Sequence, residues 1–214
     1  MKQIIRPVDE VLRENPGATD KIFWKTDVTL ISPTVAHLIS LTNPKFGKVD
    51  HVFVCTEDGT PLYDRYVVTQ NPGVIIVPYN EQFRVGLMEQ YRPGHETPFT
   101  SLPMGFAKLT EQDQREAAVR ELRQEFGIEV DLDSLVDLGQ NNLDPGSHQS
   151  FDTIYEVRCT IPQQEMDGHE GIVRVNPYGM QEIAELRRNG KLTDGLTNSA
   201  LFMYATNHPE FFRT

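Results

Sequence analysis

The chain has 214 residues, of which 38% are hydrophobic and 24% are charged, a balance typical of a folded globular protein. Its length suits one large domain, or a catalytic domain that carries a smaller extension. Thirty-one acidic residues against 20 basic ones give a net charge of −11, which disfavours binding to the phosphate backbone of nucleic acids.

The first residues and the apolar runs of the chain indicate a cytoplasmic protein without a membrane span. No run approaches the roughly 18 apolar residues that cross a bilayer. The start, MKQIIRPVDE, lacks the small-residue cleavage site of a secretory signal. Cys55 and Cys159 stand in apolar stretches that resemble strands, with no second cysteine or histidine at metal-binding spacing. We therefore expect two buried free thiols in a reducing compartment.

The N-terminal part of the chain is predicted to be a β-rich extension. One or two amphipathic turns around Val8, Val11 and Leu12 should end at Asn15-Pro16-Gly17. Short β-branched runs then predict strands over residues 27–31, 35–42, 51–56 and 63–69, with a hairpin turn at Glu57-Asp58-Gly59. The break at Asn71-Pro72-Gly73 divides an extension, residues 1–70, from a catalytic domain, residues 71–214. The extension is our candidate dimerisation element.

The rest of the chain alternates between strands and helices. The stretch 111–126 lacks Gly and Pro, is rich in Glu, Arg, Ala and Leu, and stops at Gly127, which predicts a helix with a glycine C-cap. Strands are expected over residues 74–78, 83–91, 135–138, 153–159 and 172–175, and two further helices over 179–188 and 198–205. This order indicates a mixed α/β sandwich and not a doubly wound parallel sheet.

Two carboxylates in the predicted helix point to a divalent cation. Glu121 and Glu125 are four residues apart, so they lie one turn above each other on the same side of the helix. Like charges in this arrangement repel unless a cation lies between them, and Mg²⁺ prefers such oxygen ligands. The alternative is a solvated acidic face opposite an apolar stripe of Ala118, Leu122 and Phe126. The helix alone leaves both interpretations open.

The surrounding residues resemble the Nudix box, the loop-helix-loop motif of Nudix hydrolases, written G-x5-E-x7-R-E-U-x-E-E-x-G-U with U aliphatic. The matching residues are Gly105, Glu111, Arg120-Glu121-Leu122, Glu125 and Gly127-Ile128. The resemblance implies a divalent metal, Mg²⁺ or alternatively Mn²⁺, that is bound by Glu121 and Glu125 against a diphosphate. It also implies that Arg120 orients Glu121 and that Glu111 pairs with Arg120.

The chain departs from this pattern at two places. Eight residues instead of seven separate Glu111 from Arg120, which predicts a bulge near residues 110–113. Gln124 stands where the pattern has a glutamate, and its neutral amide can offer an oxygen to the metal without offsetting charge. We expect a weaker metal site or fewer metals. The alternative is a Nudix-like binding or regulatory domain with weak catalysis or none.

The flanks of the box resemble the ADP-ribose pyrophosphatases and their nucleotide-sugar relatives. Gln90-Tyr91-Arg92 resembles their Q-[YF]-R, and Leu102-Pro103-Met104-Gly105 resembles L-P-A-G. The resemblance implies that Arg92 binds substrate and that the carbonyl of Met104 binds metal. A planar guanidinium also suits a diphosphate on physical grounds, and the alternative is a surface arginine at a strand end. Ser101 replaces a glutamate that relatives often carry.

Two further segments supply candidate site residues through the same resemblance. In the acidic, glycine-bearing loop 165–171, Glu170 occupies the position of the glutamate that helps activate water, with His169 and Glu165 as rivals. A plain acidic surface loop is the alternative. Trp24, or else Phe23, could stack on the adenine, although a lone aromatic before a strand is more often part of a core.

These observations together predict a Nudix-like α/β/α sandwich with a mixed sheet and an N-terminal β extension that builds a homodimer. The expected reaction is Mg²⁺-dependent hydrolysis of a nucleoside diphosphate derivative to a nucleoside monophosphate and a sugar phosphate. ADP-ribose or a related nucleotide sugar is the expected substrate. A hydrolase of GDP-mannose or another sugar nucleotide shares this chemistry and remains open.

Overall fold

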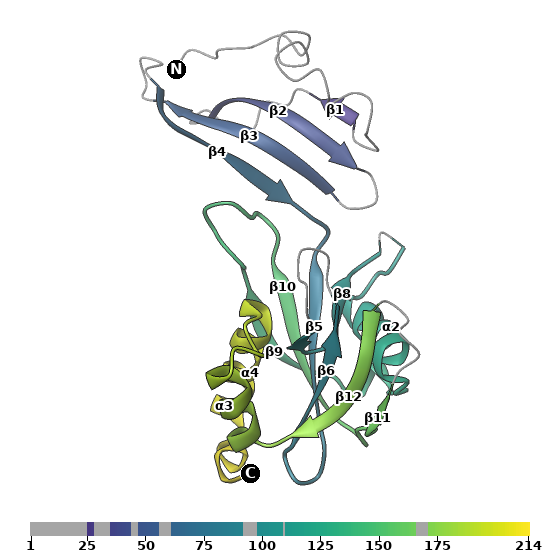
Figure 1. Ribbon diagram of the computed structural model, residues 1–214. Coiled ribbons are helices and arrows are strands. Elements are labelled where there is room, and N and C mark those ends of the chain that lie inside the picture. Colours follow the sequence, from purple (N-terminus) through teal and green to yellow (C-terminus); the bar gives the residue numbers. More distant parts are fainter. Residues whose placement is uncertain are drawn as a thin grey trace. The chain divides into compact units, whose positions relative to one another are not determined.

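The computed structural model describes residues 25–27, 35–43, 47–55, 61–91, 98–108, 110–165 and 171–214. The chain divides into two compact units (Figure 1). The N-terminal unit comprises residues up to Asn71 together with Asp144–Ser150, and the C-terminal unit comprises Pro72–Leu143 and Phe151–Thr214. The turns predicted around Val8, Val11 and Leu12 lie outside the described residues.

The N-terminal unit is built on a four-stranded antiparallel sheet in the order β1-β2-β3-β4. Its strands are Lys25–Asp27 (β1), Val35–Asn43 (β2), Gly47–Cys55 (β3) and Pro61–Thr69 (β4). The strands predicted at 35–42, 51–56 and 63–69 are confirmed, although β3 begins four residues earlier. Of the strand predicted at 27–31, only its first residue is described, as the last residue of β1.

A segment from the second half of the chain adds to this sheet. The Val68 N–H donates to the Ser147 carbonyl at 2.7 Å, and the Gln149 N–H donates to the Val68 carbonyl at 3.0 Å. Ser150 exchanges hydrogen bonds with the backbone of Gln70. The segment Asp144–Ser150 therefore pairs with the edge of β4 and satisfies backbone groups that an edge strand would otherwise leave open.

The C-terminal unit contains a mixed sheet in the order β11-β12-β6-β5-β10-β9, with β7 paired to β6 and β8 paired to β5. The strands are Gly73–Tyr79 (β5), Val85–Gln90 (β6), Phe99–Ser101 (β7), Met104–Phe106 (β8), Val136–Asn141 (β9), Asp152–Arg158 (β10), Gln164–Glu165 (β11) and Ile172–Tyr178 (β12). Strand β10 runs parallel to β5, whereas the other pairs are antiparallel. The predicted mixed sheet is confirmed.

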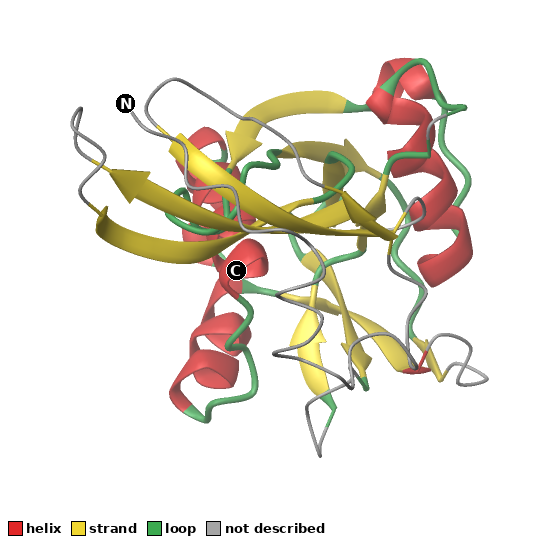
Figure 2. Ribbon diagram, turned by 90° about the horizontal axis from the view of Figure 1, so that it is seen from above, coloured by secondary structure: helices red, strands yellow, loops and turns green. Residues whose placement is uncertain are grey.

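Helices cover both faces of this sheet (Figures 1 and 2). Helix α2 (Gln114–Phe126) lies on one face, and helices α3 (Met180–Arg188) and α4 (Gly195–Asn207) lie on the other. The alternation of strand β5 fills both cores, because Val74 and Ile76 pack on the α2 side while Ile75 and Val77 pack on the α3 and α4 side. The predicted α/β/α sandwich is therefore confirmed.

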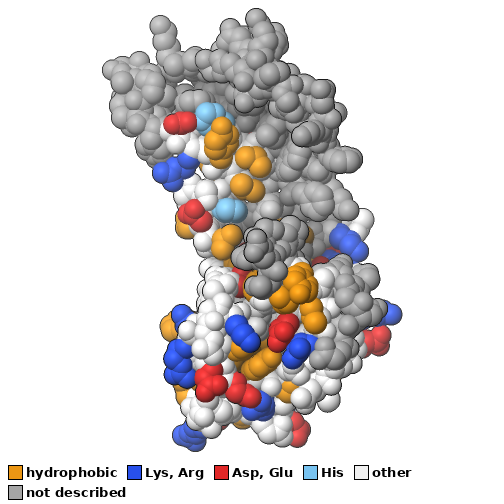
Figure 3. Space-filling model, in the orientation of Figure 1, with side chains coloured by type: hydrophobic (Ala, Val, Ile, Leu, Met, Phe, Trp, Pro, Cys, Tyr) orange, Lys and Arg blue, Asp and Glu red, His pale blue; other side chains and the backbone are white. Residues whose placement is uncertain are grey.

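The visible face of the C-terminal unit carries basic and acidic side chains interspersed with each other (Figure 3). Among the described residues, no helix combines the length and the apolar character needed to cross a membrane. Cys159 follows β10 as a half-buried free thiol, and burial raises its pKa to about 11.

The boundaries of α2 show how its sequence defines it. The helix begins at Gln114 and not at residue 111 as predicted, because the Asp113 carboxylate accepts the Arg115 N–H at 2.9 Å and caps the first turn. The additional residue of the box is thus accommodated in the loop before the helix. The predicted C-terminal end is confirmed, with Gly127 in the left-handed region at φ 68°.

We expect Gly127→Ala to lower the free energy of unfolding by about 1 kcal/mol, since a left-handed conformation costs an L-residue roughly that amount. No atom lies within 4 Å of the position that the new methyl group would take, so the effect isolates backbone strain. Gly195→Ala is the matched control, because Gly195 begins α4 without a positive φ and should be neutral or slightly stabilising. Equal effects of both substitutions in chemical denaturation would contradict this explanation.

Candidate active site

Helix α2 directs two carboxylates toward strand β8. Only 8% of Glu121 and 2% of Glu125 are exposed. The Met104 N–H donates to Glu125 Oε2 at 3.0 Å, and a side chain at Gly105 would clash with the Glu121 carboxylate. The interpretation as a solvated acidic face is therefore wrong for this pair. Glycine at residue 105 leaves open the space that the Glu121 carboxylate occupies.

Arg120 connects the carboxylates to the loop that precedes the helix. Its guanidinium donates to four oxygen atoms: Glu111 Oε1 at 2.8 Å, Glu121 Oε1 at 2.5 Å, Gln124 Oε1 at 3.0 Å and the Phe106 carbonyl at 2.9 Å. The two ion pairs expected from the resemblance are present. Such a network offsets the cost of burying carboxylates, which is high for an unpaired charge.

Glu111 holds the loop as well as the arginine. Its Oε2 accepts the Lys108 N–H at 2.6 Å, and its own N–H donates to the Lys108 carbonyl at 3.0 Å. Burial alone would raise the pKa of Glu111, but the hydrogen bonds from Arg120 and the Lys108 N–H outweigh it and lower that pKa. Burial likewise opposes the charge on Arg120, whereas Glu111 and Glu121 raise its pKa, so this residue stays cationic.

Gln124 lies beside this network on the exposed side of α2. Its amide oxygen accepts from Arg120 Nη1, the same nitrogen that donates to Glu121 Oε1. A neutral amide attracts the guanidinium less than a carboxylate would, so Arg120 stays committed to Glu111 and Glu121. Gln124 is therefore a neutral partner in the network at the position where the box pattern has a charged one.

The donors fit a hard cation that keeps water and substrate among its ligands. Glu121, Glu125 and the Met104 backbone lie together, and Mg²⁺ commonly takes one or two carboxylates and completes its shell with water and phosphate oxygens. Within the described ranges, three or more His, Cys, Asp or Glu side chains nowhere cluster as an all-protein cage. The residues present thus fit a divalent cation that takes part of its ligand shell from outside the protein.

Several predicted site residues lie outside the described part of the chain. They are Trp24, Phe23, Arg92, His169 and Glu170, and the side chain of Glu165, in β11, is not described either. The described neighbours of two of them are paired, because the Tyr91 N–H donates to the Gly171 carbonyl at 2.9 Å. The roles of these residues stay predictions.

One contact that positions the site was not predicted from the sequence. Thr197, fully buried near the start of α4, accepts the Leu102 N–H at 3.1 Å. Its own N–H donates to the capping carboxylate of Asp194. The segment that leads into β8 is thereby held from the helix on the opposite face of the sheet. The only sequence signal was an Asp three residues before a Thr at the start of a predicted helix.

Comparisons with known proteins agree with this geometry. The sequence model of the NUDIX domain matches residues 69–188, more than half of the chain. A solved structure titled "Crystal structure of ADP compounds hydrolase" superposes with a TM-score of 0.64 at 21% identity and covers 87% of this chain and 99% of that chain. The search of curated proteins finds no match.

The fold and the box residues define a hydrolase of phosphorus anhydrides in which a helix and an adjoining strand hold the acidic groups. The chain belongs to the Nudix family. The enzyme class predicted from the sequence, a Nudix-type pyrophosphohydrolase, is confirmed at this level.

We expect Glu111→Gln to lower the free energy of unfolding by about 1.5 to 3 kcal/mol at pH 7, the range for a hydrogen bond to a charged group. Because the folded-state pKa of Glu111 lies below its ordinary value of 4.5, its contribution is present above that pH. The contribution is lost as the pH falls through the lowered pKa. The difference between wild type and variant should therefore shrink in acid.

Chemical denaturation at pH 7, 5 and 3 measures this difference. Glu116→Gln is the control, since Glu116 is exposed on the same helix and should change stability by less than about 0.5 kcal/mol. A difference for Glu111→Gln that stays constant with pH would show that its charge is not what stabilises the network.

Proposed function

We propose that the protein hydrolyses the diphosphate of an ADP-linked compound, with ADP-ribose or a related nucleotide sugar as substrate, in a Mg²⁺-dependent reaction. The products would be AMP and a sugar phosphate. The observation that carries the proposal is the buried pair Glu121 and Glu125 against the Met104-Gly105 backbone, with Arg120 holding Glu121 in place. Buried carboxylates that converge on one strand suit a cation bound beside an anionic substrate.

Two lines of support favour an ADP-linked substrate. The similar solved structure is titled an ADP compounds hydrolase and covers most of this chain. The flanking motifs, Gln90-Tyr91-Arg92 and Leu102-Pro103-Met104-Gly105, resemble those of ADP-ribose pyrophosphatases. In the proposed complex, Arg92 binds the diphosphate and Trp24 stacks on the adenine. The N-terminal unit builds a homodimer.

Glu121, Glu125, the Met104 carbonyl and the Gln124 amide are the proposed metal ligands. A divalent ion held there, Mg²⁺ or Mn²⁺, would supply positive charge against the developing negative charge and would make the attacking water more acidic. Arg120 orients Glu121 through Nη1 and fixes it to the Glu111 loop, so that the ligand does not reorganise during the reaction. Glu170 is the proposed base that takes the proton from water, with His169 and Glu165 as its rivals.

A substrate panel tests the proposal directly. We would incubate the purified chain and Mg²⁺ with ADP-ribose, other nucleotide sugars, dinucleotides and nucleoside triphosphates, and follow the products by chromatography. AMP release from ADP-ribose or another ADP-linked compound is the expected result. A preference for GDP-mannose would support the same hydrolytic reaction but would show that the enzyme recognises guanine and not adenine. Saturable binding of ADP-ribose without product would favour the non-catalytic binding domain.

We expect Glu125→Gln to reduce turnover of the best substrate at least ~100-fold, because it removes the negative charge of one ligand at the reacting centre. The glutamine can still accept the Met104 N–H, so the melting temperature should change little. Glu129→Gln provides the control, since the Glu129 side chain is 76% exposed just beyond the helix. Near-normal turnover of Glu125→Gln would remove Glu125 from the site.

We expect Gln124→Glu to raise Mg²⁺-dependent turnover by at least ~3-fold if too little ligand charge limits the metal site. The new carboxylate lies on the exposed side of α2 and meets the positive Arg120, so the fold should tolerate it. Turnover measured across a series of Mg²⁺ concentrations separates tighter metal binding from faster chemistry. No gain at any concentration would show that residue 124 does not limit the reaction.

A further inference from the structure

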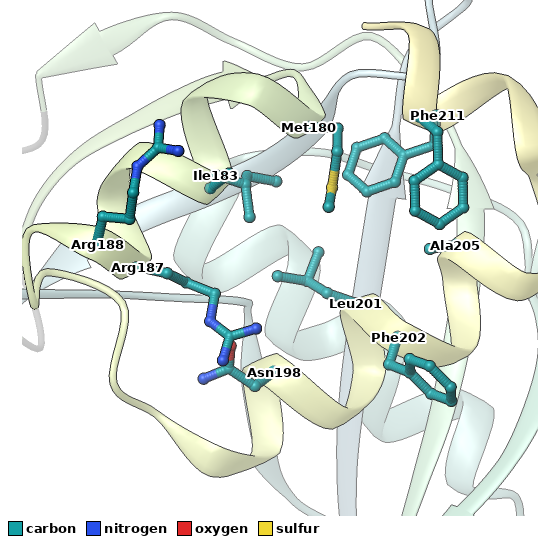
Figure 4. Close-up of a pocket in the computed structure, with 11 residues that line it drawn as sticks. Met180, Ile183, Arg187, Arg188, Asn198, Leu201, Phe202, Ala205 and Phe211 are labelled. Atoms are coloured by element: carbon teal, nitrogen blue, oxygen red, sulfur yellow. The ribbon is translucent and has the colours of Figure 1, made fainter.

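A hollow lies on the face of the sheet opposite Glu121 and Glu125. It is a groove of about 590 Å³ between α3, α4 and the short helix η3 (Pro209–Arg213). In Figure 4 the side chains of Met180, Leu201 and Phe211 converge in it. Ile183, Leu201 and Phe211 are almost fully buried and still line the groove, so it reaches the core of this face of the sheet. The groove is thus a cavity with an apolar floor.

Two large aromatic side chains border this floor and remain exposed. Phe202 on α4 is 71% exposed and Phe212 on η3 is 58% exposed, and both line the groove. Scattered surface hydrophobics are ordinary, but two phenylalanines that border an apolar cavity form a continuous apolar surface. An apolar molecule of suitable size would remove this surface from water.

The described charged residues that line the groove are both arginines. Arg187 extends from α3 toward Asn198 of α4, whereas Arg188 points away from the cavity (Figure 4). The Arg188 guanidinium lies 3.9 Å from Glu185, and within the described chain Arg187 has no carboxylate partner at ion-pair distance. A positive group beside an apolar cavity stands out in a chain whose net charge is −11. The groove therefore combines apolar walls with a cationic end.

We propose that this groove binds a free amphipathic carboxylate, with its aliphatic chain in the cavity and its carboxylate against Arg187. The volume lies within the roughly 300 to 1,000 Å³ typical of small-molecule sites. The guanidinium fork matches a carboxylate with two parallel hydrogen bonds. Asn198, whose side-chain N–H₂ donates to the Asp194 carbonyl at 2.7 Å, is held in place on the opposite side of this end.

Two other occupants fit the charge and shape less well. A symmetric contact between two copies would bring the same arginines and two net charges of −11 toward each other. A membrane surface would contact Phe202 and Phe212 but would not require a cavity that reaches the core. The apolar floor with Arg187 at one end (Figure 4) is complementary to a small molecule of one negative charge.

Calorimetric titration of the full chain with decanoate tests the proposal. We expect saturable one-to-one binding, weakened at least ~10-fold in Arg187→Gln and less than ~2-fold in Arg188→Gln. The two variants lose the same charge at adjacent residues of one helix. The comparison therefore separates a direct contact with Arg187 from a general effect of lost positive charge. The uncharged analogue decanol should bind at least ~10-fold more weakly than decanoate. Hydrolytic turnover of both variants should equal that of the wild type.

A cavity-filling variant locates the binding. Ala184 lines the groove and is partly exposed, so Ala184→Leu should abolish decanoate binding while thermal unfolding shows an intact fold. Absence of saturable decanoate binding by the wild type would overturn the proposal, as would equal weakening in Arg187→Gln and Arg188→Gln. If the wild type bound phosphatidylcholine vesicles that contain phosphatidylserine but did not bind decanoate, the proposal would be overturned. The groove would then be a contact site for a lipid surface.

Discussion

The candidate active site depends on the four hydrogen bonds of one guanidinium. Two carboxylates are removed from water next to a backbone strand, which is unfavourable unless each carboxylate finds a partner. Arg120 satisfies Glu121 and at the same time ties the helix to the Glu111 loop and to the carbonyl of Phe106. Glu125 takes the Met104 N–H. The contacts that offset the cost of burying the two carboxylates therefore also fix their positions. The interactions that stabilise the fold thus place the proposed metal ligands.

The strand that these carboxylates face is held from both sides of the sandwich. On the α2 side, Glu125 accepts the Met104 N–H, and on the α4 side, Thr197 accepts the Leu102 N–H. Between them, the Pro103 carbonyl accepts the Ile76 N–H of β5, a strand whose side chains fill both cores. A short segment that cannot bury much surface of its own is thus fixed by three neighbours. This fixation requires the complete sandwich and not the box alone.

How much of this was predictable depends on how local each feature is. Helix α2, the pairing of Arg120 with Glu111 and the mixed sandwich follow from periodicity, residue type and the box resemblance. Strands β7 and β8 were missed because three residues carry no measurable alternation. The predicted helix start was wrong because Glu111 suits a helix as well as a loop. The capping hydrogen bond of Asp113 places the start at Gln114. The Thr197 contact joins residues 95 positions apart.

Gln124 gives the site a neutral side chain where the box pattern has a carboxylate. Glu111, Glu121 and Glu125 with Arg120 carry a formal charge of −2, which a single divalent cation neutralises. A glutamate at residue 124 would add a further negative charge, and neutrality would then require additional cation charge. Arg120 donates to the Gln124 amide and also contacts Glu111, Glu121 and the Phe106 carbonyl. Residue 124 is therefore a position at which the charge of the site can be changed while Arg120 has other partners in Glu111 and Glu121.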